Sequence, residues 1–339
     1  MNIAFTSNNV EKQQERKPAS KAEGAVLGAV AGIGTQTIIK KAFCKPALKE
    51  LQNINDTFSK QNSSSLNFNI NNIKNGKLSV SDFVETINNS KVNTLAEEFK
   101  TAAGKAFDYS GLSKKGVSIL DANKVDFDEF FEIMKKGASK LDNKLLSKSK
   151  LYKKITQTFL QPAYKSAKQG CNAFFISNKV NKIFLNKDKA SIFAFHEMGH
   201  AVNKHFSKIG NILQKSRKLQ WLSTISLGVA FLKGKKKDNE EPKGIFDKTT
   251  TFVKNNAGKL AFIGMLPTVI EEGLASINGH KLAKSVLSAE NLKKLDKLNI
   301  KCWLTYVGLA LGTTLGTMAA SKVRDEAVNP TTKIKQENV

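Results

Sequence analysis

Two histidines and a glutamate stand at a spacing that suits metal chemistry. The segment His196-Glu197-Met198-Gly199-His200 places its histidines four residues apart, which puts them on one face of a helix. Two neutral imidazoles in this arrangement are typical zinc ligands, and the glutamate between them can take a proton from a water that the metal activates. The pattern therefore predicts hydrolysis of a peptide bond with Glu197 as general base.

A zinc site of this kind needs a third protein ligand. His205 stands five residues after His200 and points to a different helix face, and Phe206 occupies the next position. Further along the chain, Glu271 and Glu272 can supply a carboxylate from a second helix. Adjacent helical residues point about 100° apart, so only one of the two glutamates should face the metal. The ExxA spacing favours Glu272, which leaves Glu271 as a solvated or supporting acid.

A family resemblance follows from these residues. The run His196–His205, HEMGHAVNKH, resembles the HExGHxxx(R/K)H signature of the HtpX and CAAX-prenyl-protease family of integral-membrane gluzincins. That family takes its third ligand from an ExxAD motif, and Glu272–Ser276, EGLAS, is similar, with Ser276 in place of the aspartate. The resemblance covers roughly residues 173–287 and does not specify a prenyl-protein substrate. It implies that His196, His200 and Glu272 are zinc ligands and that Glu197 is the general base.

Nearby segments should support the zinc helix. Residues 173–178 and 182–186 are expected to form two short strands around an asparagine-containing turn. This hairpin either presents an edge to an extended substrate or only supports the helix. Asp188 can cap a helix that runs from Ala190 to about Phe206. His280, two turns after the downstream glutamate, is either an oxyanion stabiliser or an ordinary helix histidine, and His205 is expected to be structural.

Four uncharged runs predict membrane-associated helices. They cover residues 24–39, 221–232, 260–270 and 302–321. Only the last is long enough by itself to span a bilayer, which takes about 20 residues, and the first is borderline. The two middle runs are too short and fit either a re-entrant hairpin or helices buried in protein. Glycines recur every fourth residue in the first and last runs, which predicts that these two helices pack together through their glycine faces. Lysines flank every run, so the positive-inside rule gives no orientation.

Composition excludes several classes of protein. The 339 residues carry a formal net charge of +25, but the lysines are scattered and no nucleic-acid recognition module accompanies them. They either attract an anionic membrane surface or are simply solvated. Three distant cysteines, Cys44, Cys171 and Cys302, argue against a disulfide scaffold and favour a reducing compartment. The first 20 residues lack the apolar stretch of a secretory signal.

Two segments resemble the second half of an EF-hand calcium loop. They are residues 71–82 and 118–129, and each leads into a Phe-containing helix start. The earlier carboxylate ligands of such a loop are missing from both. A degenerate helical pair used for packing or partner binding is therefore favoured over calcium binding.

The expected fold class is α+β, mainly α, of the gluzincin metallopeptidase type with membrane-associated hydrophobic helices. The order along the chain is a disordered N-terminus at 1–22, a glycine-striped hydrophobic helix at 23–44, a helical accessory region at 45–165, a metallopeptidase core at 166–300, a C-terminal transmembrane helix at 301–323 and a polar tail at 324–339.

The expected function is that of a zinc-dependent endopeptidase at a membrane. Its partners would be a protein or peptide substrate and membrane lipids, with no specific nucleic acid. We expect it in the cell membrane with the zinc site on the cytoplasmic side. The alternative is an inactive, protease-derived scaffold that mediates assembly, although such a protein would have no need of Glu197.

Overall fold

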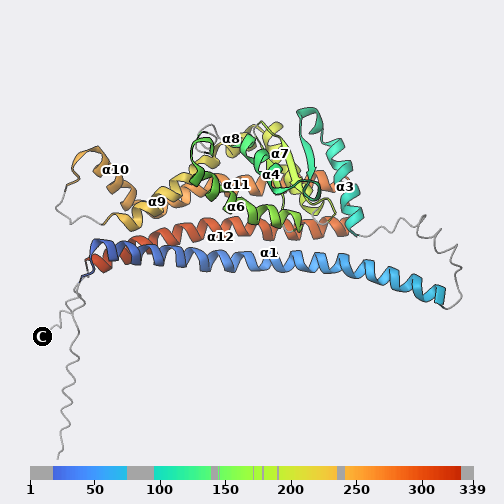
Figure 1. Ribbon diagram of the computed structural model, residues 1–339, viewed down its shortest axis with the longest axis horizontal. Coiled ribbons are helices and arrows are strands. Elements are labelled where there is room, and N and C mark those ends of the chain that lie inside the picture. The colour runs from blue at the N-terminus through green and yellow to red at the C-terminus, as the bar shows by residue number, and fades with distance from the viewer. Residues whose placement is uncertain are drawn as a thin grey trace, which may run out of the picture. The chain divides into compact units, whose positions relative to one another are not determined.

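A computed structural model describes residues 18–74, 95–138, 144, 146–170, 172–177, 179–188, 191–234 and 241–329. These residues form helices and one small sheet, so the chain is mainly helical with few strands (Figure 1). The chain divides into two compact units. The first comprises the described parts of 1–37, 222–262 and 312–339, and the second those of 38–221 and 263–311.

A three-stranded sheet lies in the second unit. Its strands are β1 (Ser118–Asp121), β2 (Phe174–Ile176) and β3 (Lys182–Leu185), in the order β1-β3-β2. β2 and β3 are antiparallel, with Phe174 opposite Phe184, so the hairpin predicted from the sequence is confirmed. β1 pairs with β3 in parallel. β2 is therefore an edge strand on the side that faces away from β1.

The central strand β3 is buried on both faces. Ile183 and Leu185 belong to a core that includes Phe195, from the helix that carries His196 and His200. Phe184 instead packs with Phe130 and other aromatic residues in a second core. Alternate residues of a strand point to opposite faces, which explains why this strand is apolar almost throughout. The sheet therefore joins the two cores of this unit.

Shorter helices surround the sheet. Three of them begin at side-chain caps: Asp126 accepts from the backbone N–H of Glu129, Ser149 from that of Tyr152, and Ser207 from that of Gly210. The helices are α3 (Leu95–Tyr109), α4 (Phe127–Gly137), α6 (Lys150–Lys168), α7 (Ser191–His205) and α8 (Lys208–Ser216). Single 3-10 turns cover Ser113–Lys115, Ala122–Lys124 and Arg217–Leu219.

Several longer helices extend beyond the boundaries expected from sequence. The run at 260–270 and the helix expected from Glu271 form one helix, α11, with Pro267 inside it. The expected boundaries after residues 44 and 300 fall inside α1 and α12. These longer elements are α1 (Lys21–Lys74), α9 (Gln220–Leu232), α10 (Gly244–Asn255), α11 (Ala257–Lys284) and α12 (Ala289–Val328).

Glycines bring α1 and α12 together in the first unit. A Cβ at Gly316 would lie 2.5 Å from the carbonyl oxygen of Gly32, and a Cβ at Gly28 would lie 2.7 Å from that of Ala320. The two helix backbones are therefore in direct contact, as the glycine spacing predicts. Gly28 faces Ala320 rather than Gly312, so the register differs from a simple pairing of the two glycine repeats.

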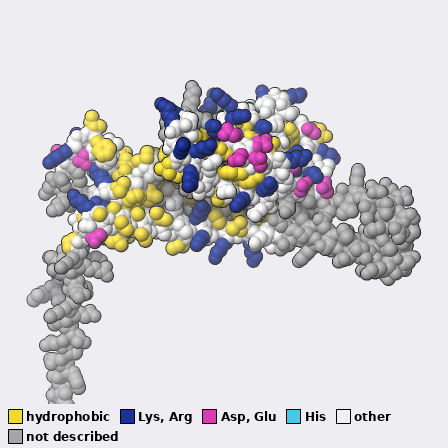
Figure 2. Space-filling model, in the orientation of Figure 1, with side chains coloured by type: hydrophobic (Ala, Val, Ile, Leu, Met, Phe, Trp, Pro, Cys, Tyr) yellow, Lys and Arg dark blue, Asp and Glu magenta, His cyan; other side chains and the backbone are white. Residues whose placement is uncertain are grey.

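Two described helices are long and apolar enough to cross a membrane, by length and composition: α1 over Lys21–Ile54, and α11. The sequence prediction had instead chosen 301–323, which lies in α12. The frequent Gly and Thr residues of α12 contribute little hydropathy, and it falls short by the same measure. In the first unit, hydrophobic side chains gather over α9 and α10 (Figure 2), where Ile245 and Phe246 are 85% and 83% exposed.

The EF-hand-like segments have different outcomes. Residues 71–74 end α1, and the rest of the 71–82 segment lies outside the described residues. Residues 118–129 form β1, a 3-10 turn and the start of α4. Asp121 and Asp126 cap the turn and the helix by accepting backbone hydrogen bonds. Asp126, one of the carboxylates that suggested a calcium loop, is therefore a helix cap.

Candidate metal centre

Helix α7 carries the two histidines and is held in place by its apolar faces. Phe195 and Met198 are fully buried in the core of the second unit, and Phe195 meets the ring of Phe99 from α3 edge to face. With these residues fixed in the core, His196, Glu197 and His200 are directed toward α11. The helix is thus buried nearly all round, as its composition predicts.

Glu272 of α11 completes a cluster with the two histidines. Its Oε2 lies 3.2 Å from Nε2 of His196 and 3.3 Å from Nε2 of His200. One donor atom from each of the three residues lies within 4.8 Å of the other two. All three side chains are largely buried, with at most 12% of each exposed. This group could hold a metal ion, and two imidazole nitrogens with one carboxylate oxygen are a suitable donor set.

Outer hydrogen bonds, made at the Nδ1 atoms, orient both imidazoles so that each Nε2 faces the cluster. Ser276 donates its hydroxyl proton to the Glu272 carbonyl, so it must accept from Nδ1 of His196, 3.1 Å away. Glu271 accepts from Nδ1 of His200 at 2.9 Å. In the neutral imidazoles both protons then sit on Nδ1, and the lone pairs of Nε2 point at Glu272. Ser276 thus performs the orienting task despite replacing an aspartate.

Glu271 is a supporting residue that is fully buried, not solvated. Its Oε1 accepts hydrogen bonds from the side-chain amides of Asn203 and Gln214, each at 2.9 Å, in addition to His200. Arg217 bridges the two glutamates: one guanidinium nitrogen lies 3.1 Å from Oε2 of Glu271 and the other 2.9 Å from Oε1 of Glu272. The oxygen of Glu272 that faces the imidazoles is therefore separate from the one that Arg217 holds.

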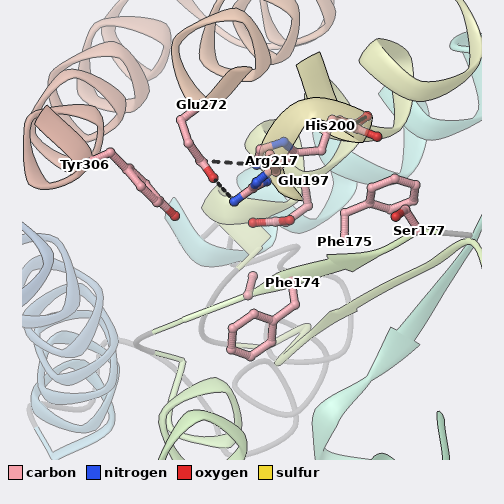
Figure 3. A pocket seen from close by; sticks show the side chains of 10 residues that line it. Phe174, Phe175, Ser177, Glu197, His200, Arg217, Glu272 and Tyr306 are labelled. Atoms are coloured by element: carbon pink, nitrogen blue, oxygen red, sulfur yellow. Dashed lines mark hydrogen bonds and ion pairs between the residues drawn. The ribbon is translucent and has the colours of Figure 1, made fainter. Parts of the chain in front are cut away.

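Glu197 borders a cavity of about 180 Å³ beside the cluster (Figure 3). Burial raises the pKa of Glu197, although the neighbouring His200 and His196 act in the opposite direction. Phe174 and Phe175 of the edge strand β2 line the same cavity, and Tyr306 of α12 points into it from another side. The cavity therefore joins a buried carboxylate, the possible metal site and a strand edge.

Two glycines fix the spacing of α7 and α11. A Cβ at Gly199 would collide with the backbone carbonyl of Ala275, and a Cβ at Gly279 would collide with that of Phe195. Each helix thus presents a glycine to the backbone of the other. The separation of the histidines from Glu272 is consequently set by backbone contact.

The remaining histidines lie apart from this cavity. His280 does not line it; its Nδ1 lies 2.7 Å from Asp296, beside a groove between α11 and α12. The proposed oxyanion role for His280 is therefore wrong, because two turns of helix carry it past the site. Among the described residues, Nε2 of His205 is buried without a hydrogen-bond partner, so this ring does not tie the scaffold together through that atom.

Sequence reasoning missed Arg217 and Tyr306. The chain has three arginines among its 54 basic residues, so an arginine is the exception here. Arginine is preferred over lysine for pairing with two carboxylates at once, and that rarity was a usable signal. Tyr306 lies in a run expected to cross a membrane, and nothing local marks it.

No known protein family, curated protein or solved structure matches this chain.

Proposed function

We propose that this chain is a membrane-associated, zinc-dependent endopeptidase of the gluzincin kind. One observation carries the proposal: Nε2 of His196, Nε2 of His200 and Oε2 of Glu272 converge beside the buried carboxylate of Glu197. The outer hydrogen bonds of Ser276 and Glu271 further support it. The combination agrees with the resemblance to the HtpX and CAAX-prenyl-protease family.

Zinc is the metal that this donor set fits best. Two imidazoles and a carboxylate are a common ligand set of catalytic zinc sites, which leave one position for water or substrate. When bound, zinc lowers the pKa of a water molecule and polarises the carbonyl of the scissile bond. Calcium and magnesium favour all-oxygen sites and fit two imidazoles poorly.

Glu197 is the proposed general base. Its carboxylate borders the cavity, yet it is not among the three convergent donors. Because burial raises its pKa, it is better matched to proton transfer near neutral pH than an exposed glutamate. It would take a proton from the attacking water and deliver it to the leaving amine. An extended substrate could pair with the edge of β2, which borders the same cavity.

The proposed partners are a protein or peptide substrate and membrane lipids, with no specific nucleic acid. Helices α1 and α11 support association with a membrane, which we propose to be the cell membrane. Cys44 and Cys302 are free. Free thiols agree with a reducing compartment, so we place the zinc site on the cytoplasmic side.

The test is to replace Glu197 by Gln in the full-length chain. The substitution keeps the shape of the side chain and leaves all three donors in place, so zinc should remain bound at the parent stoichiometry. Cleavage of an unfolded protein substrate such as casein should fall by about 10²–10⁴-fold, because the amide cannot accept the proton. His196→Ala is the matched comparison, since it should lose zinc and activity together.

Two outcomes would contradict the proposal. Parent-like cleavage by Glu197→Gln would show that Glu197 is not the base. A parent protein that binds zinc but cleaves no substrate would instead favour the inactive scaffold.

A further inference from the structure

A second cavity, of about 170 Å³, lies on the other side of the catalytic residues. His196 and Glu197 form one wall, and Ala173, Glu197 and Tyr306 border both this cavity and the one that contains Arg217. The rest of the wall comes from three helices of the same unit and from Asn172 and Ala173 in the loop before β2. α1 provides Ala47, Leu48 and Leu51, α7 provides Phe193, and α12 provides Leu298 and Cys302.

Seven of the thirteen residues that line the cavity are apolar, and the other six are polar. Apolar walls with a few convergent polar groups are typical of pockets that bind small groups specifically. Because the cavity touches Glu197, anything bound in it would lie next to a peptide bond positioned for attack. An apolar side chain would gain free energy there by leaving water.

Asn299 is one of the polar residues that border this cavity. The residue is only 5% exposed, and its Nδ2 has no hydrogen-bond partner among the described residues. A buried amide N–H without a partner is costly, so such a group is expected to meet a ligand or a water. A peptide substrate offers the matching acceptor in its backbone carbonyls.

We propose that this cavity, the α1–α7–α12 pocket, is the subsite for an apolar side chain adjacent to the cleaved bond, with Asn299 donating to a neighbouring backbone carbonyl. The inference rests on the proposed peptidase function and names its substrate class: peptides with a leucine- or phenylalanine-sized residue beside the scissile bond. It also gives α1 a role in recognition, since Leu48 and Leu51 complete the pocket.

The experiment measures binding separately from cleavage. Fluorescently labelled decapeptides of Gly and Ser, identical except for one central Ala, Leu or Phe, are titrated into the Glu197→Gln protein, with zinc and with chelator. The Leu and Phe peptides should bind at least about tenfold more tightly than the Ala peptide, because each methylene buried in an apolar pocket strengthens binding by about 10–200-fold. Equal affinity for all three peptides would overturn the proposal.

Two variants place the preference in this pocket. Leu48 is 56% exposed, so Leu48→Trp can add bulk at the pocket wall without opening the core. It should abolish the preference for Leu over Ala. Asn299→Leu should weaken binding of all three peptides by about threefold to tenfold, the usual contribution of one hydrogen bond. An unchanged preference in Leu48→Trp would show that the peptides bind elsewhere.

A control variant tests whether the peptides bind instead in the groove between α11 and α12. Asn299 also borders the groove between α11 and α12, whose lining includes the exposed Ile300. Ile300→Ala should leave peptide binding unchanged, and a loss of preference there would overturn the assignment in favour of the groove.

Cleavage by the zinc-loaded parent then separates the two proposals. Cleavage of the Ala, Leu and Phe peptides at equal rates would support the proposed peptidase activity and contradict the proposed subsite. If Leu48→Trp abolishes selective binding but the parent cleaves none of the peptides, the pocket is supported and the peptidase activity is contradicted.

Discussion

The two adjacent glutamates of α11 should contribute very differently to zinc binding. Glu272 directs Oε2 at Nε2 of both imidazoles. Glu271 reaches one imidazole, that of His200, and binds it at Nδ1, on the side of the ring away from the cluster. Replacing each by Gln conserves volume in a site where both side chains are almost fully buried. The comparison therefore isolates charge and hydrogen bonding from cavity formation.

The magnitude for Glu271→Gln follows from its hydrogen bonds. Oε1 accepts from three donors, so the amide oxygen should take that position and the amide NH₂ should face Arg217. The bond from His200 then loses its charged acceptor, a change of about 1–1.5 kcal/mol. Zinc affinity should fall about tenfold, at the lower end of the 10–100-fold typical of outer-shell partners.

Glu272→Gln should cost more, because it replaces an anionic ligand by a neutral amide. We expect a loss of more than about 100-fold, beyond the range of outer partners. Affinities can be measured by competition with a fluorescent zinc chelator. Glu290→Gln is the matched control, since that side chain is 80% exposed and should leave zinc binding unchanged. A larger loss from Glu271→Gln than from Glu272→Gln would reverse the ligand assignment.

Other predictions concern protons, orientation and packing. Burial lowers the pKa of His200, but the two glutamate carboxylates beside it raise that pKa further, to well above its usual value. Zinc must displace the resulting proton, so its affinity should rise about tenfold per pH unit until that pKa is passed; a flat profile from about pH 6 to 8 would contradict this. Ser276→Ala should weaken zinc binding about 10–100-fold by leaving Nδ1 of His196 without its acceptor, and Ser276→Asp should restore it; parent-like affinity in the Ala variant would refute the orienting role. Gly316→Leu should lower the free energy of unfolding by at least about 1–3 kcal/mol in chemical denaturation, because the new side chain meets a backbone carbonyl of α1. Gly228→Leu faces open space and should cost far less; equal losses would argue against the close helix contact.

Local sequence patterns predicted the parts of the site that are local. The spacing of His196 and His200 requires them to share a helix face, and two short apolar runs around an asparagine-containing turn marked the hairpin before them. The ExxA spacing selected Glu272 over Glu271, and the structure brings Glu272 to the imidazoles. Each of these inferences needs only the geometry of one element.

Features that depend on tertiary packing were not predictable in this way. β1 was assigned to an EF-hand-like segment and not to a strand, because four residues that pair in parallel with a distant strand carry little signal of their own. α11 was divided after residue 270, where the apolar run gives way to Glu271 and Glu272, although one helix continues through both. Arg217 and Tyr306 reach the cavity from separate elements, and their relation to Glu272 exists only in the folded chain.

The glycine contact between α7 and α11 has a consequence for which cations the site can accept. Since Gly199 and Gly279 each meet the opposing backbone, the two helices cannot approach further, and the adjoining core resists their separation. The donor atoms of the proposed metal site stay within 4.8 Å of one another. Zinc, with bonds of about 2.0–2.2 Å, would fit this arrangement better than calcium, which needs about 2.3–2.6 Å and several more oxygens. The fixed spacing of the two helix backbones would thus select against large ions by size, independently of the selection that the ligand types make.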